Sequence, residues 1–419
     1  MSPLSPADAA GAGSPHPGIG FAAFVSLLAA LMAMNALATD IMLPALPEMA
    51  LSLRAASTTE TQTVISAYLI GFGLGQIFMG LISDRYGRRL PILIGLGVYL
   101  LAALVVAGAT DLATALGARF VQGVGAAAPR VIVAASIRDC YSGRRMARVL
   151  SLTMMVFMAA PVVAPALGQL TLAFAPWQAI FGLLALYAGG LLVLCWRLYP
   201  ETLPVERRMP IRRAAVMAGF ARVLGDRQTI GYVVAAGAIF GALFGYINSS
   251  QQLLVGVYGL GTLFPAVFAA TAAALALSSF ANARLVERFG MRFLSHAASL
   301  CFLGLSVLML GLDLAGALNL TWLIALLVAV TLLMGLVFPN FNALSMAPHQ
   351  QAAGIAASVT GAGSTLLGTG LGYIIGQAFN GSATPMAVGF MVCALGTMLT
   401  LLITERGRLF RAGQPLGRA

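Results

Sequence analysis

One acidic residue, Asp40, lies inside an apolar segment that runs from Ile19 to about Leu46. Every other Asp and Glu falls at or beyond the end of an apolar segment. A charged carboxylate is costly in the hydrocarbon layer of a membrane and is a functional candidate by default. Because an apolar environment favours the neutral form of a carboxyl group, we expect Asp40 to exchange protons near neutral pH. Pro44 and Pro47 follow closely, so the alternative is a hydrogen-bonded structural acid near a helix end.

Two arginines, Arg119 and Arg130, lie in another apolar segment, almost three helical turns apart and therefore on roughly the same side of a helix. A buried arginine needs a partner, and Asp40 is the acid available within the apolar segments. One carboxylate cannot neutralise two arginines, so we expect at least one of them to line a water-filled cavity. The alternatives are a purely structural Arg119 and an Arg130 that extends toward the cytoplasm.

Polar and aromatic side chains in the apolar segments are candidates for a substrate cavity. A mostly apolar wall with few polar groups suits amphipathic molecules. For any one of these residues, helix packing or an interhelical hydrogen bond is the commoner role, and we favour Tyr68, Asn248 and Phe338 only as a set. The candidates are Tyr68, Gln122, Arg130, Phe240, Phe244, Asn248, Gln251, Phe338, Asn340 and Asn342.

The composition is that of a membrane protein. Of the 419 residues, 60% are hydrophobic and 9% charged, whereas soluble domains carry about 25% charged residues. A membrane-spanning helix needs about 20 apolar residues. The sequence predicts an all-α membrane protein with twelve transmembrane helices, at about 21–46, 61–82, 90–109, 112–135, 149–171, 177–198, 229–256, 262–282, 293–314, 320–345, 353–378 and 384–403.

The 24 basic residues are all arginines, and they gather between alternate apolar segments. The positive-inside rule then predicts that both termini are cytoplasmic. This distribution explains the net charge of +11 without a nucleic-acid partner. We expect a monomer in the lipid bilayer, and solvated side chains at His296 and His349, which lie near segment ends.

The longest interruption, 199–228, is predicted to be a cytoplasmic linker between two six-helix halves at 21–198 and 229–405. Residues 1–20 are predicted to form a disordered cytoplasmic tail, and 406–419 a second cytoplasmic tail. The four isolated cysteines have no metal-binding spacing. The chain also lacks a nucleotide-binding loop or a catalytic triad, so we expect no enzymatic activity, cofactor or metal.

A basic loop recurs in both halves. Asp84-Arg85-Tyr86-Gly87-Arg88-Arg89 follows the second apolar segment, and Glu287-Arg288-Phe289-Gly290-Met291-Arg292 follows the eighth. The repeat predicts two pseudo-symmetric halves, as in transporters that move one half against the other. We interpret Gly80, Asp84, Arg85, Gly87, Arg88 and Arg89 as a latch that forms in one conformation and breaks in another. The alternative is a basic loop that only fixes the topology.

The spacing Gly-x-x-x-Asp-Arg-x-Gly-Arg-Arg from Gly80 to Arg89 resembles the loop between spans two and three of the major facilitator superfamily (MFS). Residues 119–127, RFVQGVGAA, resemble the fourth-span motif of its proton-driven drug exporters. Residues 160–168, APVVAPALG, are similar to its fifth-span antiporter motif, with Pro161, Pro165 and Gly168, although Ala160 and Ala164 replace frequent glycines. Asp40 with Leu43-Pro44-Ala45-Leu46-Pro47 looks like the first-span signature of its Bcr/CflA drug-resistance subfamily.

The resemblance implies an MFS fold and a proton/drug antiporter of the bacterial inner membrane. In it, Asp40 would exchange the proton and Arg119 would couple its protonation to the conformation. With one acid, the expected substrates are neutral or monocationic small molecules. The first alternative is a proton-coupled uptake symporter for a small metabolite. The second is a sensor or scaffold that transports nothing, which would not need charges inside the membrane.

Overall fold

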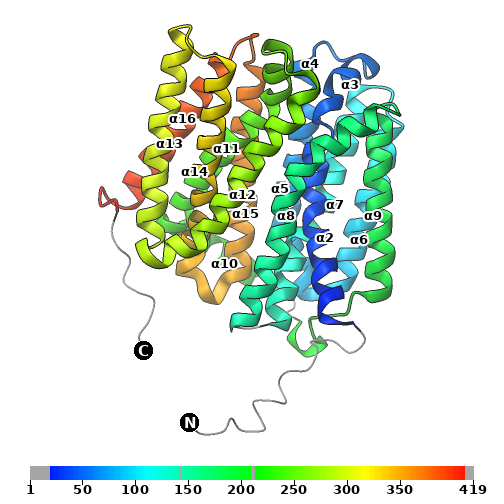
Figure 1. Ribbon diagram of the computed structural model, residues 1–419. Coiled ribbons are helices and arrows are strands. Elements are labelled where there is room, and N and C mark those ends of the chain that lie inside the picture. Colours follow the sequence, from blue (N-terminus) through cyan, green and yellow to red (C-terminus); the bar gives the residue numbers. More distant parts are fainter. Residues whose placement is uncertain (1–18, 142, 209–212, 411–419) are drawn as a thin grey trace.

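The structure is a computed structural model that describes residues 19–141, 143–208 and 213–410. Within these residues, twelve α-helices of 19 or more residues run back and forth through the molecule (Figure 1). They confirm the predicted all-helical fold, and most begin and end within a few residues of the predicted segments. The helices are α2 (Phe21–Asp40), α5 (Thr63–Tyr86), α6 (Arg89–Ala107), α7 (Leu112–Cys140), α8 (Gly143–Leu172), α9 (Gln178–Leu198), α11 (Arg227–Gln251), α12 (Phe264–Phe289), α13 (Met291–Leu314), α14 (Leu320–Met346), α15 (Ala353–Gln377) and α16 (Thr384–Thr404).

Shorter elements connect these helices. The first predicted segment ends as a helix at Asp40, where the 3-10 turn η2 (Leu43–Ala45) and the short helix α3 (Leu46–Ser52) follow. The others are α4 (Thr58–Thr61), η3 (Val205–Arg207), α10 (Arg213–Gly225), the π-helical turn η4 (Gln252–Val257), η5 (Gly261–Leu263) and η6 (Ala347–Ala352). Helix α10 lies within the predicted linker. The predicted tails fall largely at 1–18 and 411–419, outside the described residues.

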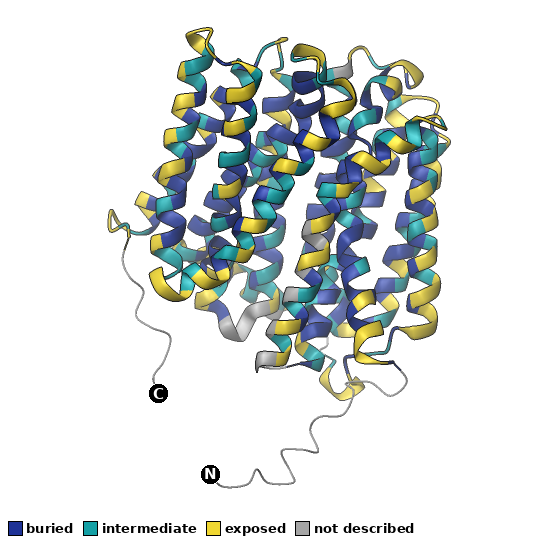
Figure 2. Cartoon of the chain, in the orientation of Figure 1, coloured by how far each residue is buried: buried dark blue, intermediate teal, exposed yellow. Residues whose placement is uncertain are grey.

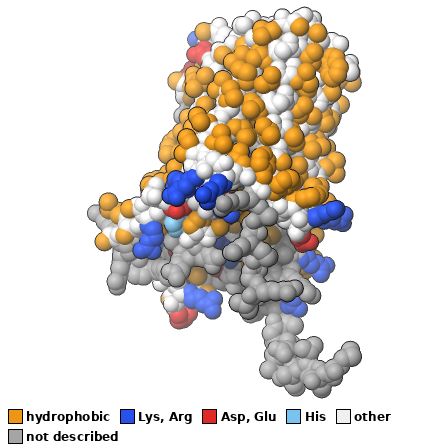
Figure 3. Space-filling view, turned by 90° about the vertical axis from the view of Figure 1, so that its left-hand side faces the viewer, with side chains coloured by type: hydrophobic (Ala, Val, Ile, Leu, Met, Phe, Trp, Pro, Cys, Tyr) orange, Lys and Arg blue, Asp and Glu red, His pale blue; other side chains and the backbone are white. Residues whose placement is uncertain are grey.

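The helical body has a surface suited to lipid. Ten helices in the described part of the chain are long and apolar enough to cross a membrane. Helix α8 contains the predicted apolar segment 149–171, and α15 contains many Gly, Ser and Thr residues, which suit close packing against other helices. Hydrophobic atoms cover most of the body in Figure 3, and arginine side chains gather near its lower edge.

Two pairs of helices join the halves. Helix α5 of the first half packs against α15 of the second, and α8 packs against α12. The first residues of α2 lie at the lower end of the bundle in Figure 1, with α10, and α3 and α4 lie at the upper end. We call these the terminal end and the distal end. Buried residues line the contacts between helices, while exposed ones face outward (Figure 2).

The two basic loops have the same backbone shape, which agrees with the predicted pseudo-symmetry. Gly87 follows α5 with φ of 88° and ψ of 176°, and Gly290 follows α12 with φ of 78° and ψ of 154°. Side chains disfavour positive φ, so glycine is suited to both positions. The repeated sequence therefore marks two equivalent turns.

Candidate functional site

Asp40 is the last residue of α2 and is only 3% exposed. Its carboxyl oxygen Oδ1 is buried and has no hydrogen-bond partner. The carbonyl end of a helix carries a partial negative charge, which disfavours an anion at this place. Burial, the missing partner and the helix dipole all favour the neutral carboxyl group. The alternative was a structural acid that is fully hydrogen-bonded. It does not agree with the structure, because Oδ1 of Asp40 has no partner.

Helix α8 touches the turn that follows Asp40. A side chain on Gly168 would overlap the carbonyl oxygen of Ile41, and its Cβ atom would lie 3.5 Å from Cδ of Pro44. Pro161 and Pro165 lie on the same helix, which continues through both of them. Gly168, the last residue of the motif at 160–168, is therefore in direct contact with the backbone beside Asp40.

Arg119 of α7 is fully buried. Its guanidinium donates to the carbonyl oxygen of Ala38 (3.1 Å), the carbonyl oxygen of Val64 (3.3 Å) and Oε1 of Gln122 (2.8 Å). The sequence offered Asp40 as the available acid, but no ion pair among the described residues joins it to Arg119. The physical reason is that α2 ends at Asp40, which leaves the last carbonyl groups of the helix free to accept bonds from a cation.

Tyr68 lies beneath Arg119. The guanidinium carbon is 4.4 Å from the centre of the Tyr68 ring, close enough for a cation–π interaction. The Tyr68 hydroxyl donates to Oδ1 of Asn35 at 2.9 Å. A side chain on Gly71 would overlap the backbone of Phe120, and one on Gly123 would overlap the backbone of Tyr68. These glycines let α5 and α7 approach closely, which places Tyr68 against Arg119.

Arg130 is half-buried on α7, and its Nη1 lies 3.9 Å from Sδ of Met32. Met32 is about halfway along α2, so this contact argues against an Arg130 that extends to the cytoplasmic end of its helix. Arg130 and Arg119 thus lie in different surroundings, although they are on the same helix.

The aromatic candidates of the second half form one cluster. The rings of Phe240 and Phe338 are stacked with centres 4.3 Å apart, and those of Phe240 and Phe244 are 5.6 Å apart. All three side chains are half-buried. The structure thus brings α11 and α14 together in an apolar wall, which we call the Phe240 cluster.

The amide candidates do not share one location. Asn248 donates to the carbonyl oxygen of Gly372 at 3.2 Å, and its own Oδ1 has no partner. Asn340 bonds Asn282 of α12 at 2.7 Å, and Asn342 bonds the carbonyl oxygen of Phe338 at 3.0 Å. Gln251 lines a pocket near the distal end. The structure thus divides the predicted substrate residues into the Arg119 surroundings, the Phe240 cluster and the distal pocket.

The basic loop of the first half is held by a network around Arg88. This buried guanidinium contacts Asp84 at 2.6 Å and Asp139 at 2.8 Å. Although burial disfavours its charged form, the bonds to Asp139 and Asp84 raise the pKa of Arg88 above its ordinary value. The backbone N–H groups of Arg88 and Arg89 donate to Glu201, just after α9.

The same loop reaches the second half at two points. A Cβ atom on Gly80 would lie 3.1 Å from Oγ of Ser358, and one on Gly354 would lie 3.8 Å from Oδ2 of Asp84. Both partners are on α15. Arg85 is exposed, and its guanidinium lies 5.4 Å from the ring centre of Tyr86.

An equivalent network in the second half was missed by the sequence analysis. Arg292 contacts Glu405 at 3.0 Å, and Glu405 accepts a bond from the hydroxyl of Tyr232 at 2.7 Å. Tyr232 also contacts His296, which is buried rather than solvated as predicted. His349 is buried as well. The repeat in the sequence could have indicated this second network. Glu201 and Glu405 each follow the last helix of a half, and each binds the basic loop of its own half.

No group of three or more His, Cys, Asp or Glu that could hold a metal ion occurs in the described part of the chain. The candidate site consists of the buried Asp40, the buried Arg119 and the Phe240 cluster.

The fold is that of a multi-pass α-helical membrane protein. The family model of the Major Facilitator Superfamily matches residues 28–372, and the chain belongs to this superfamily. The chain is 30% identical to the bicyclomycin resistance protein homolog of Haemophilus influenzae, over 90% of this chain and 94% of that protein. It is 27% identical to multidrug resistance protein D of Escherichia coli, over 93% and 97%. The fold is similar to that of the E. coli xylose transporter XylE, with a TM-score of 0.71 and 12% identity over 94% and 99% of the chains.

Proposed function

We propose that this protein exports drug-like small molecules across the bacterial inner membrane in exchange for protons, with both termini in the cytoplasm. The names of its bacterial relatives, a bicyclomycin resistance protein homolog and a multidrug resistance protein, support export. The arrangement of arginines supports the orientation. The terminal end is then cytoplasmic, and the distal end faces outward.

The buried carboxyl group of Asp40 carries this proposal. It is 3% exposed, and one of its oxygens has no hydrogen-bond partner. A site of this kind holds a proton when closed to water and releases it when water enters. Asp40 is the proton carrier, and the proton leaves it when the surrounding helices separate.

Arg119 couples the charge on Asp40 to the arrangement of helices. It binds the carbonyl oxygen of Ala38, two residues before Asp40, and also the backbone of α5 through Val64. An ionised Asp40 would attract the buried guanidinium away from these carbonyl groups. Deprotonation would therefore change the contacts among α2, α5 and α7.

Transport proceeds by alternating access of the two halves. The contacts between α5 and α15 and between α8 and α12 are the surfaces that must move. At the terminal end, Asp84 lies beside the first turn of α15, whose N-terminus favours a negative charge. The Asp84 loop latches the outward-open state by holding this end closed. The Phe240 cluster, with Arg130 and Asn248, forms the substrate cavity.

One proton is sufficient for useful export. A proton that moves through about 100 mV releases about 2.3 kcal/mol. At about 1.4 kcal/mol per tenfold ratio, this sustains a gradient of about 50-fold for a neutral substrate.

The test uses inside-out membrane vesicles with an acidified interior and follows the collapse of the pH gradient when candidate drugs are added. Collapse with the wild-type protein, but not with Asp40→Asn, is expected. Equal collapse with both proteins would place the proton site elsewhere. A failure of every drug to collapse the gradient would favour the uptake symporter.

A further inference from the structure

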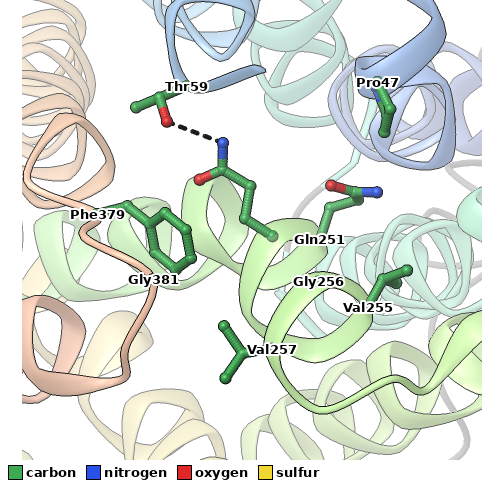
Figure 4. Close-up of a pocket in the computed structure, with 9 residues that line it drawn as sticks. Pro47, Thr59, Gln251, Val255, Gly256, Val257, Phe379 and Gly381 are labelled. Carbon is green, nitrogen blue, oxygen red and sulfur yellow. Dashed lines mark hydrogen bonds between the residues drawn. The ribbon is translucent and has the colours of Figure 1, made fainter. Parts of the chain in front are cut away.

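At the distal end, residues of both halves border an open pocket of about 590 Å³. Asp40, Arg119, Arg130, Asn248 and the Phe240 cluster do not line it. Pro47 and Thr59 of the first half face η4, Phe379 and Gly381 of the second half across it (Figure 4). The volume is typical of small-molecule sites. No residue that lines it, among those the structure describes, carries a charge.

Gln252 lines this pocket, and one atom of its side-chain amide is an unpaired acceptor. Its Nε2 donates to Oγ1 of Thr59 at 2.9 Å, the dashed line in Figure 4, which fixes the orientation of the amide. Its Oε1 is buried and has no hydrogen-bond partner, and the residue is only 9% exposed. Buried carbonyl oxygens normally have a partner, so the free Oε1 calls for a donor from a bound molecule.

Two neighbouring amide side chains, Gln62 and Asn248, also have buried polar atoms without a hydrogen-bond partner. Gly376 of α15 lies against both Gln62 and Asn248. A Cβ atom on Gly376 would lie 2.8 Å from Oε1 of Gln62 and 2.9 Å from Cβ of Asn248. Both amide atoms of Gln62 and Oδ1 of Asn248 are buried without a partner. Gln252 is one helical turn beyond Asn248. The contact between the halves thus contains several unpaired, uncharged amide atoms.

The wall of the pocket has an unusual backbone. Gln252–Val257 forms a π-helical turn directly after α11. Such turns are rare and occur frequently at functional sites. This turn presents Gln252 and the apolar side chains of Val255 and Val257 to the same pocket.

We propose that the distal pocket is a second binding site, selective for an uncharged molecule whose N–H or O–H group donates to Oε1 of Gln252 and whose apolar part packs on Val257 and Phe379. The inference rests on the proposed function, in which a neutral substrate occupies this pocket on its way out. A cation finds no carboxylate here, so the pocket favours neutral compounds over charged ones.

The test is a binding titration with the purified full-length protein in lipid nanodiscs, followed by fluorine NMR of 4-fluorobenzamide. The matched probe is 4-fluoro-N,N-dimethylbenzamide, which has no N–H group. We expect Gln252→Leu to weaken binding of the first probe about three- to tenfold, as for the loss of one neutral hydrogen bond. Binding of the second probe should change less than about twofold.

Two further variants keep the test decisive. Val257→Trp fills the pocket and should weaken both probes, whereas Gly182→Ala, on α9 and away from the pocket, should weaken neither. Proton exchange is measured separately, by the collapse of the pH gradient in vesicles, so a failure of proton exchange and a failure of this site are separate results. Unchanged binding in Gln252→Leu, or an equal loss for both probes in that variant, would overturn the proposal.

Discussion

Gly168 packs directly on the carbonyl oxygen of Ile41, the residue that follows Asp40. This contact joins two segments that are far apart in the sequence, the Pro-rich motif at 160–168 of α8 and the end of α2. Because the contact is between backbones, it leaves no flexible side chain that could yield. A movement of α8 would therefore displace the backbone next to Asp40.

Gly168→Ala is expected to destabilise the protein by about 1–3 kcal/mol, as overpacking does in other buried sites. It should also slow drug-induced collapse of the pH gradient, because the turn beside Asp40 is displaced. Thermal unfolding and the vesicle assay measure the two effects. Gly182→Ala on α9 is the control, since a Cβ atom there would meet nothing within 4 Å. Equal behaviour of the two variants would show that the contact does not matter.

Arg119→Lys keeps the charge but loses the planar group that reaches Ala38, Val64 and Gln122 at once. Hydrogen bonds to charged groups contribute about 1.5–3 kcal/mol each, so we expect a loss of about 3 kcal/mol in stability and a large loss of transport. Thermal unfolding and the vesicle assay test this. Arg145→Lys, at an exposed position, should behave as the wild type. A fully active Arg119→Lys would remove Arg119 from the coupling.

Tyr68→Phe separates the two interactions of that residue. The ring stays beneath Arg119, but the hydrogen bond to Asn35 is lost. We expect a stability loss of about 1 kcal/mol with transport largely retained. If transport fails in Tyr68→Phe while stability is kept, the hydroxyl itself takes part in the cycle.

Arg88→Ala should be among the most destabilising changes in the loops. Its guanidinium is buried between Asp84 and Asp139, and removal of one partner from a buried ion pair costs about 3–5 kcal/mol. Arg85→Ala, at an exposed position in the same loop, should change stability by less than about 0.5 kcal/mol. Similar unfolding temperatures for the two variants would refute the network.

The charge of the substrate should decide which force drives export. Exchange of one proton for a neutral molecule moves one positive charge inward, so an inside-negative membrane potential should accelerate it. Exchange of one proton for a monocation moves no net charge and should depend on the pH gradient alone. In right-side-out vesicles, potassium with valinomycin sets the potential while efflux is measured. Steep export of dications would contradict a single carboxylate.

The fold was predictable because twelve apolar segments, a basic linker and a repeated loop are local features of the sequence. The site was predictable only in part. Asp40 and Arg119 were found as charges within apolar segments, but the hydrogen-bond partners of Arg119 were not. Two of these three partners, Ala38 and Val64, are backbone carbonyl groups, which carry no sequence signal. Whether Ala38 has a free carbonyl depends on where α2 ends, and the apolar run continues beyond that point.

Glycines show the same limit. The spacings Gly71-x-x-x-Gly75 and Gly368-x-x-x-Gly372-x-x-x-Gly376 indicate close helix packing in the first place. The family resemblance adds a second interpretation, a sliding surface between spans two and eleven. In the structure, Gly71 and Gly75 pack on α7, and Gly368 and Gly372 pack on α11, within their own halves. Gly376 alone of these also meets the other half, at Gln62. Spacing identifies a close-packed helix face, but not the helix against which it packs.

The two networks that close the halves have a consequence for biosynthesis. The described side-chain partners of Arg88 and Glu201 all lie within residues 83–208, and those of Glu405 lie within 232–292. Neither network needs a residue from the other half. The first can therefore be complete while the ribosome is still translating the second, and each half can fold as a unit before the two assemble.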